Sequence, residues 1–418
     1  MIHQPYNALF ITNRSKLKAY LNKDTLAILF SAQPMPRNGD QHFPYRENSD
    51  FFYFTGIEQE YSALILTPTE DILFIQEQNE KHKLWEGDRL TPEQASSLSG
   101  IKQVEPYSQL ESYLHKLAQN RHHLYFNIRE PLVSKSIQSP DEFFFSNFRE
   151  KYPFYQYHSA RGIIEKLRIK KEPGEIEYIR QSIHITHSAF ERILQKTKPG
   201  INENELEAEL RHEFQLKHSV PAYDPILASG KNACVLHYTK NNRNCQNGDL
   251  LLMDIGAEKH NYAADISRTV PVNGKYSERQ RVCYEAVLEV QKRAIKAAIP
   301  GKSLSDLNEQ VKEWLSEKHI ELGLYTEKDK SEELIHTYFP HGVSHFMGLD
   351  VHDCGNKETI LEEGMVITCE PGLYIPGENI GIRIEDDILV GKQPVNLSRE
   401  IPKEIAEIEK LMNSTNDT

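Results

Sequence analysis

The stretch that decides the fold runs from residue 250 to residue 270 and reads LLLMDIGAEKHNYAADISRTV. Apolar and alternating runs on either side of a polar tip are typical of a β-hairpin. With the tip between Lys259 and His260, Asp254 faces Asp265 directly across the two strands, on one face of the ladder. Like charges about 4 Å apart repel by on the order of 4 kcal/mol at a protein surface. Opposed carboxylates are therefore not a stabilising contact. One such pair is more often solvent-facing than functional, so it becomes a candidate site only if further acids join it.

The same arrangement recurs in residues 369–385, which read CEPGLYIPGENIGIRIE. The Pro-Gly-Glu-Asn sequence at 376–379 predicts a turn, and pairing around this turn sets Glu370 opposite Glu385. Because side chains alternate between the two faces of a strand, four more residues share the face of these glutamates. They are Gly372, Tyr374, Gly381 and Arg383.

Both hairpins are expected to be buried, because apolar runs at 250–253 and 365–367 lead into the acids. Buried carboxylates need cations or hydrogen-bond donors, and four of them without a counter-charge would repel strongly. Divalent metal is the simplest counter-charge. Carboxylates with an imidazole suit Mn, Fe, Co or Zn, and a majority of oxygen ligands favours Mn.

Histidines gather between the two hairpins, in residues 339–353, which read FPHGVSHFMGLDVHD. His341 and His345 are four residues apart, but Gly342 stands where a metalloprotease of the H-E-x-x-H type has its glutamate, so that motif is excluded. A single histidine is more often structural than functional, whereas several beside an acidic hairpin are candidate ligands or proton carriers. The candidates are His237, His341, His345 and His352.

Helical patterns alternate with strand-rich stretches across the second part of the chain. Helices are expected at 173–199, 203–217, 277–298 and 303–322, and strand-rich stretches at 225–272 and 341–392. This order suggests two structurally similar halves and an α+β domain.

The front of the chain alternates between short apolar strands and helices, which predicts a separate α/β domain. Strands are expected at 26–30, 51–54, 63–66, 72–75 and 124–127, and helices at 80–86 and 107–119. The polar and aromatic stretch 139–157 is interpreted as a linker. The predicted domains are 1–160 and 161–418.

The composition narrows the class of protein. The chain has 418 residues, 39% hydrophobic and 26% charged, and a net charge of −12, which disfavours a nucleic-acid partner. No apolar run is long enough to span a membrane, and no secretory signal is recognised at the N-terminus. Five scattered cysteines disfavour a disulfide framework, so a cytoplasmic protein is expected.

The ordered motifs D-x10-D, H-G-x-S-H-x-x-G-L-D-V-H-D, E-P-G-L-Y and G-I-R-I-E-D-D resemble those of the aminopeptidase P (Xaa-Pro aminopeptidase) family, in the pita-bread metallopeptidase superfamily. The segment FPYRENSDFFYFTG, residues 43–56, is similar to the N-terminal domain of that family. The resemblance implies an α/β N-terminal domain followed by an α+β pita-bread catalytic domain. It also implies a metal-dependent exopeptidase that cleaves Xaa-Pro-Yaa peptides and forms homo-oligomers, dimers or tetramers.

The resemblance assigns roles to five metal ligands. Asp254 would bind one of two ions, Asp265 and Glu385 would bridge both, and His345 and Glu370 would complete the second. A hydroxide bridging the two ions would be the nucleophile. Glu370 would accept and return the proton.

Further family positions surround the expected substrate. By resemblance, His237, His341 and His352 are catalytic, with His237 or His352 polarising the scissile carbonyl, and Tyr374 and Arg383 lie near the glutamates. Trp85, in KLWEG at 83–87, is similar to a tryptophan that approaches the pocket of a neighbouring subunit. A lone tryptophan more often belongs to core packing.

Other functions stay open at this point. A prolidase, which cleaves only Xaa-Pro dipeptides, more often has glycine where this chain has Ser344. Methionine aminopeptidases lack the long front domain that this chain has. Creatinase works without metal, and the intact ligands of this chain argue against it. A non-catalytic pita-bread binding protein would be expected to have lost ligands, whereas this sequence retains all five.

Overall fold

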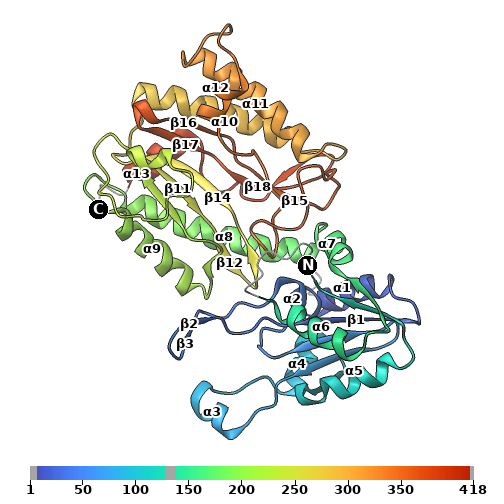
Figure 1. Ribbon diagram of the computed structural model, residues 1–418. Helices are drawn as coiled ribbons and strands as arrows, with labels where there is room; N and C mark the ends of the chain where they lie inside the picture. The colour runs from blue at the N-terminus through green and yellow to red at the C-terminus, as the bar shows by residue number, and fades with distance from the viewer. Residues whose placement is uncertain (1–6, 129–137, 415–418) are drawn as a thin grey trace. The chain divides into compact units, whose positions relative to one another are not determined.

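The computed structural model describes residues 7–128 and 138–414 of the chain, drawn in Figure 1. It divides into two compact units, one ending at Arg168 and the other beginning at Ile169. The sequence placed the boundary near residue 160. Helix α7 (Arg161–Arg168) lies beyond that point and packs against α1 (Ala8–Lys18) of the first unit.

The first unit contains a six-stranded mixed sheet with the strand order β6-β5-β4-β1-β7-β8. Its strands are β1 (Thr25–Phe30), β4 (Ala63–Leu66), β5 (Asp71–Ile75), β6 (Gln103–Pro106), β7 (His123–Phe126) and β8 (Gln156–Ser159). A separate small hairpin consists of β2 (Pro36–Asn38) and β3 (Gln41–His42). All six residues of β1 are buried, as expected for a strand with neighbours on both sides and helices over both faces.

Helices of the first unit complete this α/β domain. They are α1, α2 (Ser49–Thr55), α3 (Glu80–Glu86), α4 (Pro92–Ser99), α5 (Leu110–Ala118), α6 (Pro140–Lys151) and α7. The strands share an aromatic core with α5 and α6, centred on Phe74, Phe126 and Phe148.

Two sequence predictions in this unit were wrong. Residues 51–54 form part of α2 rather than a strand, because the Asn48 side chain accepts hydrogen bonds from the N–H groups of Asp50 and Phe51 and caps the helix. Every residue of α2 is buried, so it lacks the one-sided pattern that identifies a helix. The predicted linker 139–157 contains α6, which Ser139 begins with a capping box.

The second unit repeats one order of elements twice. Helices α8 (Pro173–Lys196) and α9 (Glu203–Leu216) precede β9 (Val220–Pro221), β10 (Ile226–Ser229), β11 (Leu250–Ile255), β12 (Ala257–Lys259), β13 (Tyr262–Ala263) and β14 (Ile266–Pro271). Helices α10 (Glu278–Ala297), α11 (Leu304–Glu321) and α12 (Glu332–Tyr338) precede β15 (Val366–Cys369), β16 (Gly372–Ile375), β17 (Ile380–Arg383), β18 (Asp386–Leu389) and β19 (Val395–Asn396). Helix α13 (Ile405–Ser414) follows. The four predicted helices are confirmed to within a few residues.

Helices cover the strands of the second unit on two sides (Figure 1). Helix α8 packs against β12 and β13, α9 against β9 and β10, and α10 against β15, β16 and β17. A buried apolar cluster joins α10 and α11 to β15 and β18. Strand β14 lies beside β17, so the hairpins of the two halves meet in the interior between the helical layers. Among the described residues, none of the helices is long and apolar enough to cross a lipid bilayer.

A buried histidine in α11 gives a testable pH dependence of stability. His319 is 0% exposed, and burial lowers its pKa to about 4. The unfolded chain binds a proton near pH 6.5, so stability is complete above that pH and is lost as the pH falls toward 4, by about 3 kcal/mol. We expect His319→Leu to remove this part of the pH dependence in urea unfolding between pH 7.5 and 4.5. An unchanged slope would contradict a neutral, buried imidazole.

Candidate metal centre

The first hairpin differs from the predicted register. Lys259 pairs with Tyr262 and Asp254 with Ser267, so the tip lies between His260 and Asn261. Both tip residues have positive φ, 52° and 61°, as the favoured two-residue hairpin turns require. The direct pairing of the two aspartates was therefore wrong. Asp265 is a diagonal neighbour of Asp254 and still projects from the same face, because it stands two residues before Ser267.

A break in the first hairpin lies where Asp265 projects. Strands β11 and β14 form one ladder, β12 and β13 another, and Gly256 and Asp265 stand between the two ladders. A Cβ on Gly256 would lie 1.9 Å from the carbonyl oxygen of Ala264, so only glycine allows this close approach.

The second hairpin has the predicted register. Gly372 pairs with Arg383 and Tyr374 with Gly381, and the ladder of β15 and β18 continues the same register. Glu370 directly follows β15, and Glu385 directly precedes β18, so both glutamates stand at a break between ladders. The Glu385 N–H donates to the carbonyl oxygen of Ser267 at 3.0 Å, which joins the second hairpin to the first.

The histidine segment reaches the acids alongside β15. The His345 N–H donates to the Thr368 hydroxyl at 3.1 Å, and the Thr368 N–H donates to the carbonyl oxygen of His345 at 2.9 Å. His345 Nε2 lies 3.3 Å from Asp265 Oδ2 and 3.8 Å from Glu370 Oε1. Burial lowers the pKa of His345, but the hydrogen bond and charge of Asp265 outweigh it and raise the pKa to about 9.

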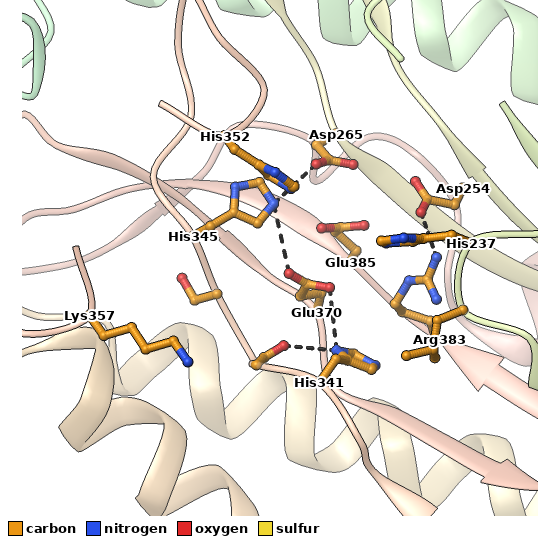
Figure 2. Close-up of a pocket in the computed structure, with 13 residues that line it drawn as sticks. His237, Asp254, Asp265, His341, His345, His352, Lys357, Glu370, Arg383 and Glu385 are labelled. Atoms are coloured by element: carbon orange, nitrogen blue, oxygen red, sulfur yellow. Dashed lines mark hydrogen bonds and ion pairs between the residues drawn. The ribbon is translucent and has the colours of Figure 1, made fainter. Parts of the chain in front are cut away.

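One pocket of about 300 Å³ collects all five predicted metal ligands, as Figure 2 shows. Ligand atoms of Asp265, His345 and Glu385 lie within 4.8 Å of one another. Asp254 and Glu370 line the same pocket. The other lining residues are Leu236, His237, His341, Gly342, Ser344, His352, Lys357 and Arg383.

The mutual repulsion of these acids supports a cation in the pocket. Burial raises the pKa of Glu370 to about 7 and that of Glu385 well above its usual range, and the charges of neighbouring acids add to both shifts. Four carboxylates and one imidazole are a donor set that divalent metal ions accept. The residues present therefore fit the expected metal.

Arg383 lines the pocket and connects its two pairs of acids. Its Nη2 donates to Asp254 Oδ2 at 2.5 Å, its Nη1 to the Tyr374 hydroxyl at 2.9 Å, and its Nε to the Ser267 hydroxyl at 2.7 Å. The Ser267 hydroxyl donates to Glu385 Oε2 at 2.7 Å. The guanidinium thus orients a carboxylate in each hairpin.

Tyr374 extends this series of hydrogen bonds to His341. The Tyr374 hydroxyl lies 2.8 Å from His341 Nε2, and His341 Nδ1 lies 2.8 Å from the carbonyl oxygen of Gly342. A carbonyl only accepts, so Nδ1 carries the proton and Nε2 accepts from the tyrosine. Burial, with the charge of Arg383, lowers the pKa of His341 to about 3, which keeps the ring neutral.

The remaining predicted residues fall in two places. His237 and His352 line the pocket, and the His352 ring centre lies 4.3 Å from that of His345 at a steep angle. Trp85 lies on α3 in the first unit, is 77% exposed, and is not among the residues that line the pocket.

Tyr223 was missed by sequence reasoning. Its hydroxyl lies 2.7 Å from Asp254 Oδ1 and 2.8 Å from Asp265 Oδ1. A hydroxyl has one proton and donates to one of the two oxygens at a time. Burial and the nearby carboxylates raise the pKa of Tyr223 well above its usual value, so the group stays protonated as a donor. It precedes β10 in a loop whose sequence gives no signal of this contact.

Comparisons with known proteins agree with this fold and site, which define a metallopeptidase. Residues 177–392 match the profile of metallopeptidase family M24, and residues 10–125 match that of the aminopeptidase P N-terminal domain. The chain belongs to family M24, and within it to the aminopeptidase P proteins. The predicted architecture, an α/β domain followed by a pita-bread domain, is confirmed, as is a metal-dependent peptidase.

Similarity extends over the whole chain. The Xaa-Pro aminopeptidase of Haemophilus influenzae is 36% identical, over 97% of this chain and 97% of that protein. The Xaa-Pro aminopeptidase of Escherichia coli is 34% identical, over 96% and 97%. The solved structure of Escherichia coli aminopeptidase P with the inhibitor Pro-Leu superimposes with a TM-score of 0.90 at 32% identity, over 99% of each chain.

Proposed function

We propose that this protein is an Xaa-Pro aminopeptidase, which releases one N-terminal residue ahead of proline. The observation that carries the proposal is the convergence of four carboxylates and His345 in one pocket of a chain similar throughout to Xaa-Pro aminopeptidases. An Xaa-Pro bond is a tertiary amide without an N–H, so recognition depends on the flanking groups. The acids would attract the free ammonium of the substrate.

The site would hold two divalent metal ions, and manganese is favoured. Asp254 would bind one ion, His345 and Glu370 the other, and Asp265 and Glu385 would bridge both. Four oxygen ligands to one nitrogen support Mn over Zn, Co or Fe. Bound ions supply a nucleophile at neutral pH and polarise a carbonyl group.

Side chains of the protein would transfer protons and hold the scissile carbonyl. Glu370 lies 3.8 Å from His345 Nε2 and 3.6 Å from His341 Nδ1, so it can accept a proton in the pocket and return it to the proline nitrogen. His237 and His352 line the same pocket, and one of them would donate to the oxygen of the scissile carbonyl.

The length of the substrate separates the proposal from its alternative. We expect Xaa-Pro-Yaa tripeptides to be cleaved with a higher kcat/KM than Xaa-Pro dipeptides, measured by release of the first residue. Xaa-Ala-Yaa tripeptides serve as the control for proline dependence. Faster cleavage of the dipeptides would identify a prolidase instead.

Metal replacement tests the metal and its identity. After chelation and reloading with one ion at a time, we expect Mn²⁺ to give the highest turnover among Mn²⁺, Zn²⁺, Co²⁺ and Fe²⁺. Turnover that survives chelation unchanged would refute a metal mechanism. A protein that binds metal but cleaves none of these peptides would be a non-catalytic pita-bread protein.

A homo-oligomer, a dimer or tetramer, is part of the proposal, with Trp85 reaching the pocket of a neighbouring subunit. Leu84 and Trp85 are 82% and 77% exposed, which leaves large apolar side chains in water in a single protomer. Sedimentation of the native protein and of Trp85→Ala would test the assembly.

A cytoplasmic location is also part of the proposal. It is supported by five cysteines, all of them free thiols.

A further inference from the structure

The loop between His345 and His352 is closed at a narrow neck. The Asp353 N–H donates to the carbonyl oxygen of Phe346 at 2.8 Å, so the loop ends beside the residue where it begins. His345 is the residue before Phe346, and His352 is the residue before Asp353. Each imidazole therefore adjoins one side of the neck. The two imidazoles are therefore placed relative to each other by whatever holds the neck.

A buried ion pair fills the inside of this loop. Lys171 Nζ lies 3.0 Å from Asp353 Oδ2, and each side chain is 1% exposed. A Cβ on Gly348 would lie 2.3 Å from Asp353 Oδ2 and 2.7 Å from Lys171 Cε. The loop thus packs closely on the ion pair, and any side chain at position 348 would displace one of the two charged groups.

The backbone around the pair is joined to both acidic hairpins. The Lys171 N–H donates at 2.8 Å to the carbonyl oxygen of Gly364, just ahead of β15, the strand that leads to Glu370. The carbonyl oxygen of Gly348 accepts at 2.9 Å from the N–H of Ala263, two residues before Asp265. The ion pair therefore lies where the histidine loop meets the segments that carry the acids.

Stability alone does not account for these two charges. Taking two ions out of water is costly, and well-packed neutral residues in their place often leave a protein equally stable or more so. Glu175, also buried, adds a further acid close to the pair, and Tyr262 donates to it at 3.0 Å. A buried pair at the neck of a loop defines one position for that loop, which neutral side chains would not.

We propose that Lys171 and Asp353 are a positioning pair that fixes His352 over the reaction pocket. The inference rests on the proposed function, because its first readout is the turnover of an Xaa-Pro-Yaa tripeptide. The backbone of His345 is held separately by Thr368, so the pair acts on His352 more than on the metal ligands.

The test is the double variant Lys171→Met/Asp353→Asn, which removes both charges and keeps the side-chain volumes. We expect kcat to fall by up to about 100-fold, the cost of displacing a reacting group by about 1 Å, while metal content and KM stay near wild type. On a His352→Ala background the same two changes should lower kcat no further, because the pair acts through that ring. The control is Lys170→Met, whose partner Glu362 is exposed, and which should leave kcat unchanged.

Hydrogen exchange gives a second readout that needs no activity. We expect the amides of residues 346–353 to exchange faster in the double variant than in the wild type. Lys171→Gln/Asp353→Asn, which removes both charges and keeps a hydrogen-bond donor and an acceptor at the two positions, is the second variant if the first does not fold, and its kcat should fall in the same direction. An unchanged kcat with unchanged exchange in either folded variant would overturn the proposal, as would an equal loss on the His352→Ala background. A wild-type protein inactive on all tripeptides would instead refute the proposed function, and exchange would still decide the role of the pair.

Discussion

Asp265→Asn is expected to abolish peptide turnover and to lower the metal content of the protein. Asp265 belongs to the cluster whose ligand atoms lie within 4.8 Å of one another, and its Oδ2 is 3.3 Å from His345 Nε2. In the proposed site Asp265 would serve both ions, and an amide would offer one neutral oxygen in place of two charged ones. The loss of kcat should exceed about 100-fold, the upper range for removing only an outer partner of a ligand.

The measurement pairs metal analysis of the purified variant with its kcat on an Xaa-Pro-Yaa tripeptide. Asp224→Asn is the matched control, because Asp224 is an exposed aspartate outside the pocket and should retain wild-type metal and turnover. An Asp265→Asn variant that keeps both ions and wild-type kcat would show that the bridging role belongs to another residue.

The second hairpin could be predicted from the sequence because its turn is marked by residue type. The Pro-Gly-Glu-Asn sequence places the tip, and the register that follows sets Glu370 opposite Glu385. The first hairpin has a polar tip of several residues, and its true turn depends on positive φ at His260 and Asn261. The error shifted the register by two residues, and an even shift keeps the side chains on the same face. The aspartates therefore still meet in the pocket.

Contacts made only by tertiary structure could not be predicted in this way. In the true register Ser267 pairs with Asp254, which the wrongly predicted tip did not show. The hydrogen bonds of Ser267 with Arg383 and Glu385 were therefore not predicted. Tyr223 reaches two aspartates from a loop before β10, and neither spacing nor periodicity connects it to the hairpin. The pattern of the strands thus predicts the acids, whereas the donors that orient them appear only when the two halves pack together.

Arg383→Met is expected to destabilise the metal-free protein by about 3–5 kcal/mol, the usual cost of removing one partner from a buried ion pair. The Arg383 side chain is 5% exposed and contacts Asp254, Tyr374 and Ser267, so methionine leaves the Asp254 carboxylate, itself only 15% exposed, without its cation. Bound metal supplies positive charge to the same acids, and we expect it to restore part of the lost stability. Metal loading should therefore raise the free energy of unfolding in urea by more in the variant than in the wild type.

The matched control is Arg279→Met, because Arg279 forms an ion pair of 2.7 Å with Glu378 at the surface of the same domain. Their side chains are 37% and 36% exposed, and an exposed pair contributes about 1 kcal/mol or less. Equal losses of unfolding free energy in the two variants would mean that the ion pair of Arg383 contributes no more than an exposed pair does. A larger loss for Arg383→Met, reduced by metal, would show that this guanidinium and the metal ions share one task, which is to offset the repulsion among the four carboxylates that line the pocket.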